Sequence, residues 1–330
     1  MAVAPRLSPF EVLDLRMLRA SALAELFEEE RRHWELELRW DYGPSVDLLR
    51  RHIDAHSLPG YVALWHGRVA GYCFFVYEEQ KGLLGDLYVL AAHRGSLPPR
   101  AGDPAPIATV LLEHALETLE QSPVVERIEA QLLAFGLEPL EPLFRPRGYR
   151  VFPRLFLLKE LPFGAPPRGP QSPGAATVRP WHESDFEAAA DLIVSAYQEH
   201  IDSQINDHYS HSSGALRFLK NIILFPGCGV FRAGWSYVVE GGGGRLEGGV
   251  LVSEVADGIA HITQICVRPE LQGRGLGRRL LEASLESAAT GGCTGVSLTV
   301  TAENRSAVNL YRGLGFTVIK EFSAFTRSLR

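Results

Sequence analysis

The sequence predicts an α/β fold, an α+β arrangement with a mixed sheet, built as two similar domains in tandem. Its 330 residues correspond to about two domains of ordinary size. Residues 162–180 read PFGAPPRGPQSPGAATVRP, and this richness in proline and glycine is typical of an exposed linker. Apolar strand-like and helix-like runs occur in the same order on both sides of it. We therefore expect domains at residues 1–161 and 177–330, joined by a linker at 162–176.

The two halves end in the same pattern. Residues 310–316 read LYRGLGF before an apolar run, and residues 143–149 read LFRPRGY, with the same spacing, before VFPRLFLLKEL. Upstream, YVALWHGRVAGYCFFVYEEQKGLLGDLYVL parallels WSYVVEGGGGRLEGGVLVSEVADGIAHITQICV, and each contains three strand-like runs. A helix-like run follows in both halves, ATVLLEHALETLE in the first and LGRRLLEASLESAA in the second. These parallels indicate a whole domain that was duplicated and then diverged.

A glycine-rich stretch in the second half predicts a phosphate site. Residues 267–281 read VRPELQGRGLGRRLL, between the strand-like HITQICV and the helix-like run. Glycine lets a ligand approach the backbone, and the first turn of a helix offers unpaired N–H groups with partial positive charge. Such a junction is a cradle for an anion, most often a phosphate. Three arginines add positive charge nearby: Arg274, Arg278 and Arg279.

Three nucleotide-binding patterns can be compared with this stretch. A Walker loop needs Gly-Lys-Ser/Thr, whereas Arg278 and Arg279 follow Gly277. A dinucleotide-binding turn needs G-x-G-x-x-G close behind its strand; Glu303 could supply its acid, but too little chain follows for that fold. The third pattern, Gln/Arg-x-x-Gly-x-Gly/Ala, matches residues 272–277, QGRGLG, and resembles the signature of the GNAT superfamily of acetyl-CoA-dependent N-acetyltransferases. A glycine-rich turn without a ligand remains the structural alternative.

The resemblance to GNAT domains covers residues 177–330 and implies a fold and a cofactor site. Each domain is expected to hold a mixed, mostly antiparallel sheet, splayed between its fourth and fifth strands and flanked by helices. HITQICV would be the fourth strand and GVSLTV the fifth, with the pantetheine arm of acetyl-CoA between them. Backbone groups of the fourth strand would pair with that arm, and the loop amides would hold the pyrophosphate. The residues concerned are Ile265, Cys266, Val267, Gln272, Gly273, Arg274, Gly275, Leu276, Gly277 and Arg278.

The segment TAENRSAVNLYRGLGF matches the next helix of the family. Asn304 would contact the pantetheine or the thioester end, although it could simply cap the helix. Ala307 would leave room for the ligand. Tyr311 matches the tyrosine whose hydroxyl lies near the thioester sulfur, where a neutral phenol can protonate the departing thiolate; the alternative is an aromatic core residue. Phe144 holds the same register in the first half and has no proton to give, which favours a catalytically silent first domain.

The general base stays open at this stage. A primary amine is mostly protonated at neutral pH, so a base that removes its proton would help the reaction. His261 stands eleven residues before Gln272, where a branch of the family has a glutamate, and Glu254 is the other candidate. Gln264 could order a water molecule. The resemblance also implies a backbone N–H near Val267 as the donor to the oxyanion.

The first half departs from the family at the cradle. It reads AAHRGSLPPRAGDPAPIA where the second half has QGRGLG, and a proline has no N–H to donate to phosphate. The prolines are Pro98, Pro99, Pro104 and Pro106. We expect the first domain to keep the fold without binding coenzyme A, and to serve packing, substrate enclosure or dimerisation. A divergent loop that still binds coenzyme A is the alternative.

Composition and charge limit the classes of partner that we expect. The net charge of −6 gives no nucleic-acid footprint, and no long apolar stretch or signal sequence indicates a membrane. The four cysteines show no metal spacing, so we expect no metal, and free thiols in a soluble, reducing, cytoplasmic setting. Cys73 and Cys266 lie in apolar runs and should be buried. Residues 198–209 are polar and could wall an acceptor site; they include Gln198, Glu199, His200, Asp202, Asp207, His208 and Tyr209.

The function expected from these observations is N-acetyl transfer in the second domain. The donor would be acetyl-CoA, and the acceptor a small-molecule or peptide amine that attacks it directly through a tetrahedral intermediate. A homodimer is compatible with this layout. Two alternatives remain open: an acyltransferase that uses a bulkier acyl-CoA, and a non-catalytic acyl-CoA-binding module that recruits a partner.

Overall fold

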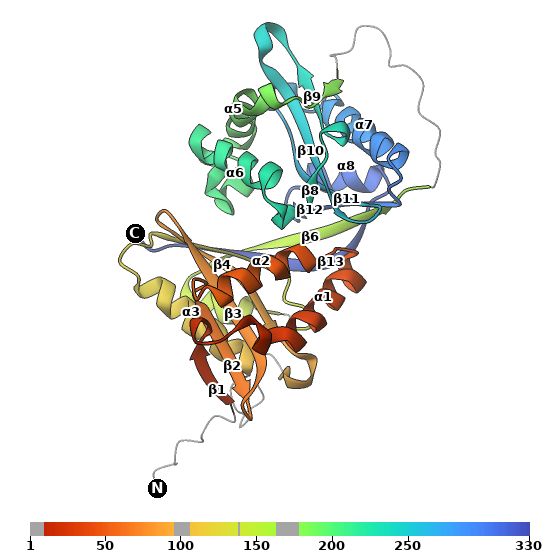
Figure 1. Ribbon diagram of the computed structural model, residues 1–330. Helices are drawn as coiled ribbons and strands as arrows, with labels where there is room; N and C mark the ends of the chain where they lie inside the picture. Colours follow the sequence, from red (N-terminus) through yellow and green to blue (C-terminus); the bar gives the residue numbers. More distant parts are fainter. Residues whose placement is uncertain (1–9, 96–105, 138, 163–177) are drawn as a thin grey trace. The chain divides into compact units, whose positions relative to one another are not determined.

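A computed structural model describes residues 10–95, 106–137, 139–162 and 178–330. The chain forms two compact units (Figure 1). The first contains Met1–Glu37, Tyr42–Pro153 and Phe322–Arg330, and the second contains Leu38–Asp41 and Arg154–Glu321. Within the described ranges, no helix has the length and apolar character needed to cross a membrane.

The second unit is a mixed sheet covered by helices on both faces. Its strands lie in the order β6-β12-β11-β10-β9-β7, with β8 paired to β10. Helices α5 and α6 cover one face, and α7 and α8 cover the other (Figure 1). The bounds are β6 Arg150–Glu160, β7 Val178–Pro180, α5 Phe186–Tyr197, α6 Ser212–Leu224, β8 Val230–Phe231, β9 Tyr237–Glu240, β10 Leu246–Ala256, β11 Ile259–Val267, α7 Leu276–Thr290, β12 Gly295–Thr301 and α8 Arg305–Gly313.

The two central strands of this sheet separate part-way along their length. Strands β11 and β12 are parallel and pair from Ile259–Gly295 to Ile262–Leu298, where the ladder ends. The pairing of β10 with β11 shifts register at the same level, so Thr263 forms a bulge that bends the strand. Beyond it, no strand of the described residues pairs with the edge of β11 that faces β12. The expected splay between the fourth and fifth strands is thereby confirmed.

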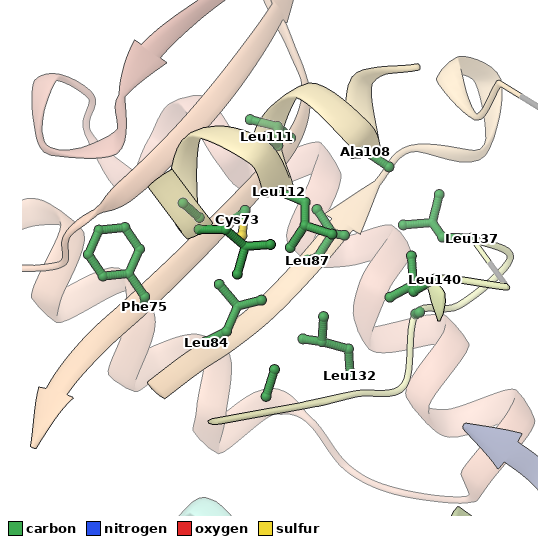
Figure 2. Close-up of a cluster of buried hydrophobic side chains, with 14 of the residues drawn as sticks. Cys73, Phe75, Leu84, Leu87, Ala108, Leu111, Leu112, Leu132, Leu137 and Leu140 are labelled. Atoms are coloured by element: carbon green, nitrogen blue, oxygen red, sulfur yellow. The ribbon is translucent and has the colours of Figure 1, made fainter. Parts of the chain in front are cut away.

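The first unit repeats this architecture. Strands β1 to β5 follow one another and β13 completes the sheet, while β4 and β5 pair in parallel only from Lys81–Arg127 to Leu84–Ala130. Helix α3 packs on the sheet over a core that includes Cys73, Leu87 and Leu112 (Figure 2). The bounds are β1 Phe10–Asp14, α1 Ala24–Leu38, α2 Gly43–Asp54, β2 Gly60–Trp65, β3 Arg68–Glu78, β4 Lys81–Val89, α3 Ile107–Gln121, β5 Arg127–Leu132, α4 Glu141–Phe144 and β13 Thr317–Ser328.

Each sheet receives a strand from the other half of the sequence. Residues 154–160 of β6 pair antiparallel with β12, and residues 323–328 of β13 pair antiparallel with β5. The last strand of each half of the sequence therefore joins the sheet of the other unit. The compact units do not divide at residue 161, the boundary expected from the sequence. The two final strands follow equivalent Gly-aromatic pairs, so the sequence does not show which sheet each one joins. Of the expected linker 162–176, residues 163–176 lie outside the described residues.

The first unit buries two carboxyl groups beside two phenols. Glu30 on α1 is fully buried and accepts a hydrogen bond from the Tyr72 hydroxyl at 3.1 Å. Asp86 on β4 accepts hydrogen bonds from the Tyr42 hydroxyl at 3.2 Å and from the backbone N–H of Leu87 at 2.7 Å. Burial raises the pKa of both carboxyl groups, and the charge of Asp86 raises the pKa of Glu30 further. Protonation of Glu30 is therefore favoured by folding.

Substitution of Glu30 tests this cluster. Because the pKa of Glu30 is higher in the folded state, its contribution to stability is complete below its ordinary pKa of 4.5 and is lost as the pH rises above it. Glu30→Gln, which does not titrate, should be more stable than the parent at pH 8 by at least ~1 kcal/mol, about the value of one pKa unit, with a smaller gain at pH 5. Urea unfolding at both pH values measures this. Glu35→Gln, an exposed change on the same helix, is the control, and a gain independent of pH would contradict the account.

Candidate active site

The glycine-rich stretch forms an open cradle at the start of α7. Gly275 caps the helix with φ 82° and Gly273 has φ 74°, both in the left-handed region that favours glycine. A Cβ added at either position would have no atom of the described chain within 4 Å. At Gly277, an added Cβ would contact Leu310 at 3.6 Å. Gly273 and Gly275 therefore face open space, whereas a Cβ at Gly277 would make an ordinary van der Waals contact with α8.

The cradle is fixed to the end of β11. The Gln272 side-chain amide donates a hydrogen bond to the Val267 carbonyl at 3.0 Å. Buried leucines of α7 hold the helix on the sheet, as the sequence predicts: Leu276, Leu280, Leu281 and Leu285. The free N–H groups of the first turn are thus presented next to the splay. Arg274 and Arg278 are exposed at this end, and Arg278 lies 3.7 Å from Glu282.

In the first unit, the equivalent position is built differently. Arg94 donates a hydrogen bond to the Val89 carbonyl at 2.9 Å, as Gln272 does to Val267. Its guanidinium also lies 3.7 Å from the Glu29 carboxylate. Helix α3 begins after Pro106, which has no N–H. Three of the prolines singled out in the sequence, Pro98, Pro99 and Pro104, lie outside the described residues.

Asn304 caps α8 and faces the loop that follows α5. Its side-chain oxygen accepts a hydrogen bond from the Ala307 N–H at 3.2 Å, which is the capping role expected from the sequence. Its side-chain nitrogen lies 3.2 Å from Nε2 of His200. The residue therefore links the start of α8 to the polar segment 198–209. Contact of Asn304 with a ligand remains a prediction.

Tyr311 lies two turns further along α8. The side chain is buried, with its ring edge-on to Phe316 at 6.0 Å. Burial raises the pKa of Tyr311 strongly, so the phenol is neutral at physiological pH. Its hydroxyl has no hydrogen-bond partner among the described residues. Phe144, its counterpart in the first unit, stacks on Phe325 with ring centroids 3.7 Å apart.

A partly buried ion pair lies close enough to influence Tyr311. Asp202 raises the pKa of Tyr311 and Arg154 lowers it, in addition to the effect of burial. The Arg154 guanidinium lies 3.7 Å from the Asp202 carboxylate and donates hydrogen bonds to Thr301 and Thr299 at 3.3 and 3.4 Å. Sequence reasoning missed Arg154 because it belongs to the first half by number. The available signal was an arginine inside the apolar run VFPRLFLL.

Two further tyrosines, Tyr197 and Tyr209, lie against this face of the sheet. The rings of Tyr197 and Tyr209 stack with centroids 4.2 Å apart. The Tyr197 hydroxyl donates a hydrogen bond to the Ile265 carbonyl at 3.4 Å, in the splayed part of β11. Burial raises the pKa of both tyrosines, so both are neutral. Cys266 faces the same cluster, and burial raises its pKa to about 12, so it is a protonated thiol.

The structure places His261 where it is a poor base. It lies in the paired part of β11, opposite Ser297, and its Nδ1 lies 2.9 Å from the Ser297 hydroxyl. Trp40 and Phe156 enclose its ring at 4.9 and 5.7 Å between centroids. Burial lowers its pKa to about 3. The expectation that His261 acts as the base is therefore not retained, because the closed ladder and the low pKa both argue against it.

The other two polar candidates have different surroundings. Glu254 is paired with Arg232 and lies opposite Ala260, at the far end of β11 from the splay, so we do not retain it as a base. Gln264 lies at the bulge with its side chain 6% exposed. Its side-chain amide lies next to the Cys266 thiol and opposes the rise in the pKa of that thiol caused by burial. A buried amide beside the splay is suited to hold a ligand or a water molecule.

Comparison with known proteins agrees with this geometry. Residues 197–316 match the acetyltransferase (GNAT) family. The mycothiol acetyltransferase of Tsukamurella paurometabola is 36% identical over 87 residues, which are 26% of this chain and 30% of that relative. The chain thus spans less than a third of the relative's length. No acceptor is identified by this match.

The same fold recurs along the whole chain in solved structures. A GCN5-related N-acetyltransferase from Sphaerobacter thermophilus aligns over 99% of this chain and 98% of its own, with a TM-score of 0.67 and 18% identity. A tandem GNAT protein from the clavulanic acid biosynthesis pathway aligns over 97% and 99%, with a TM-score of 0.61 and 17% identity. Residues 197–316 thus match the GNAT acetyltransferase family, and the chain as a whole has the fold of these solved GNAT structures.

Substitution at Gly275 tests the cradle. Gly275→Asn would place a side chain in the open space above the first turn of α7, where we expect the pyrophosphate of coenzyme A. Calorimetry should show affinity for coenzyme A reduced by at least about tenfold, or ~1.4 kcal/mol. Gly292→Asn is the matched control, since Gly292 also has a left-handed φ, 93°, and open space, but follows the other end of α7. Equal losses in both variants would mean that backbone strain, not occupation of the cradle, lowers the affinity.

Proposed function

We propose that this protein transfers the acetyl group of acetyl-CoA to an amine, and that the second unit carries out the reaction. The observation that carries the proposal is Tyr311, a neutral buried phenol with no hydrogen-bond partner among the described residues, on the helix next to the splayed strands. The open cradle at Gly273 and Gly275 supports it, because it presents free N–H groups near the same opening.

The cradle and the splay would hold the two parts of coenzyme A. The amides from Gln272 to Arg278 would bind the pyrophosphate. The unpaired edge of β11, at Ile265 to Val267, would pair with the pantetheine arm as a further strand would. Asn304 and Ala307, at the start of α8, would flank the thioester end.

The acetyl transfer then needs few protein groups. The amine nitrogen attacks the acetyl carbonyl carbon, and the oxyanion of the tetrahedral intermediate receives a hydrogen bond from a backbone N–H near Val267. The intermediate collapses by breaking the C–S bond, and the sulfur takes the proton of the Tyr311 hydroxyl. The nitrogen loses its proton, which restores the tyrosine directly or through solvent. The products are the acetylated amine and free coenzyme A.

The number of coenzyme A sites tests where binding occurs. We expect one coenzyme A per chain, because the cradle of the second unit is open and glycine-rich, whereas α3 in the first unit begins after Pro106. Isothermal titration calorimetry of the full chain with coenzyme A measures the stoichiometry. Two equivalent sites would contradict the assignment of a silent first unit.

The role of Tyr311 is tested by removing its hydroxyl. Tyr311→Phe should lower kcat by about 10²–10⁴-fold, the usual contribution of a general acid, and leave coenzyme A affinity nearly unchanged. Thiol release from acetyl-CoA, with spermidine, glucosamine and alaninamide as acceptors, gives the rates. Tyr237→Phe is the control, because its hydroxyl bonds to Ser287 of α7 and its strand, β9, is separated from β11 by β10. Parental turnover by Tyr311→Phe would return Tyr311 to the role of a core aromatic.

A further inference from the structure

Asp202 occupies the mouth of the splay. It lies in the 3-10 turn Ile201–Gln204 directly after α5, and its side chain is 16% exposed. Its carboxylate accepts a hydrogen bond from the hydroxyl of Thr301, the last residue of β12. Thr301 in turn accepts a backbone hydrogen bond from Asn304 at 3.0 Å, where the chain turns into α8. Asp202 is therefore attached to the strand end that leads to Tyr311.

The carboxylate keeps capacity for another partner. A carboxylate offers about four acceptor directions. Thr301 uses one of them, whereas Arg154 and His200 both lie 3.7 Å away, beyond hydrogen-bond distance. The remaining directions suit the N–H groups of a bound ammonium ion.

The neighbouring aromatic rings fit a cation as well. Asp202 raises the pKa values of Tyr197, Tyr209 and Tyr311, so all three phenols lie within electrostatic reach of it. The faces of such rings attract cations. Tyr197 and Tyr209 are stacked, and Phe218 lies edge-on to Tyr209 with ring centroids 5.2 Å apart. His200 lies between Tyr197 and Asp202, with its ring 5.2 Å from the Tyr197 ring and its Nδ1 3.7 Å from the Asp202 carboxylate. A carboxylate with spare acceptor directions near neutral phenols suits an amine in its protonated form.

Arg154 is the cation that lies beside this carboxylate. Its side chain is 12% exposed, and its Nε is buried with no hydrogen-bond partner among the described residues. Burying a guanidinium is costly unless an anion lies beside it, and the anion here is Asp202. Arg154 also donates to Thr301 and Thr299, so it fixes the end of β12 and the carboxylate together. The residue reaches the second unit only because β6 pairs with β12.

We propose that Asp202 binds the ammonium group of the acceptor in the acetyl-transfer site, and that Arg154, supplied by the first half of the sequence, is the residue that positions Asp202. This inference rests on the proposed function and names the acceptor as a cationic amine. The carboxylate favours the charged form of the amine, which must release one proton to solvent before its nitrogen attacks. Removing it should therefore raise KM more than it lowers kcat.

The first experiment replaces the carboxylate alone. Asp202→Asn should raise KM for the best of spermidine, glucosamine and alaninamide by about 10- to 100-fold, with kcat within about threefold of the parent. Asp257→Asn, the same charge change at the exposed turn between β10 and β11, should alter neither. A large fall in kcat with KM unchanged would overturn the proposal, because Asp202 would then act in the chemical step.

Binding without turnover separates this proposal from the proposed function. Calorimetry with the protein saturated with coenzyme A should detect glucosamine but not glucose, and alaninamide but not lactamide, because each second compound lacks the ammonium group. Asp202→Asn should lose the difference. If no amine binds the parent complex, the ammonium site is refuted. Failure of coenzyme A itself to bind would refute the proposed function instead.

The second experiment tests the positioning role of Arg154. Arg154→Met should raise the same KM, and the double variant with Asp202→Asn should be no worse than Asp202→Asn alone, since both changes remove one interaction. Guanidinium ions should partly restore Arg154→Met. Arg150→Met, an exposed change on the same strand, is the control. Additive effects without rescue by guanidinium would show that Arg154 stabilises the fold without positioning the carboxylate.

Discussion

The backbone ladder between β6 and β12 is the interaction on which the second unit's site depends. It runs from Glu160–Gly295 to Arg154–Thr301, along the whole length of β12. On its other side β12 pairs with β11 only as far as Leu298. From Thr299 to Thr301, β12 therefore pairs with β6 alone among the described strands. Unpaired buried backbone groups are costly, so this ladder is what allows the two central strands to separate.

The two units share a backbone opening and differ in the side chains that line it. Both units splay after four pairs of their parallel strands, so the backbone opening is common to both. The side chains in it differ: Asp86 lies at the bulge level where the second unit has Gln264, and Phe144 lies in the register of Tyr311. In the first unit the carboxyl groups of Glu30 and Asp86 accept hydrogen bonds from phenols of the same unit.

Local chemistry could be predicted from the sequence, and long-range pairing could not. The left-handed glycines, the leucine stripe of α7 and the Asn304 cap each depend on neighbouring residues, and the structure has all of them. The exchange of β6 and β13 depends on which of two equivalent strands reaches each sheet, and periodicity carries no such information. Arg154 was missed for that reason. His261 was misjudged because its burial by Trp40 and Phe156 involves residues far from it in the sequence.

A crystal structure of the full chain with acetyl-CoA tests the central claim most directly. The account predicts one molecule per chain, with its pyrophosphate on the amides that follow Gln272 and its pantetheine along Ile265 to Val267. The thioester sulfur should lie within hydrogen-bonding distance of the Tyr311 hydroxyl. Acetyl-CoA bound in the first unit, or bound in the second with its thioester remote from Tyr311, would contradict the account.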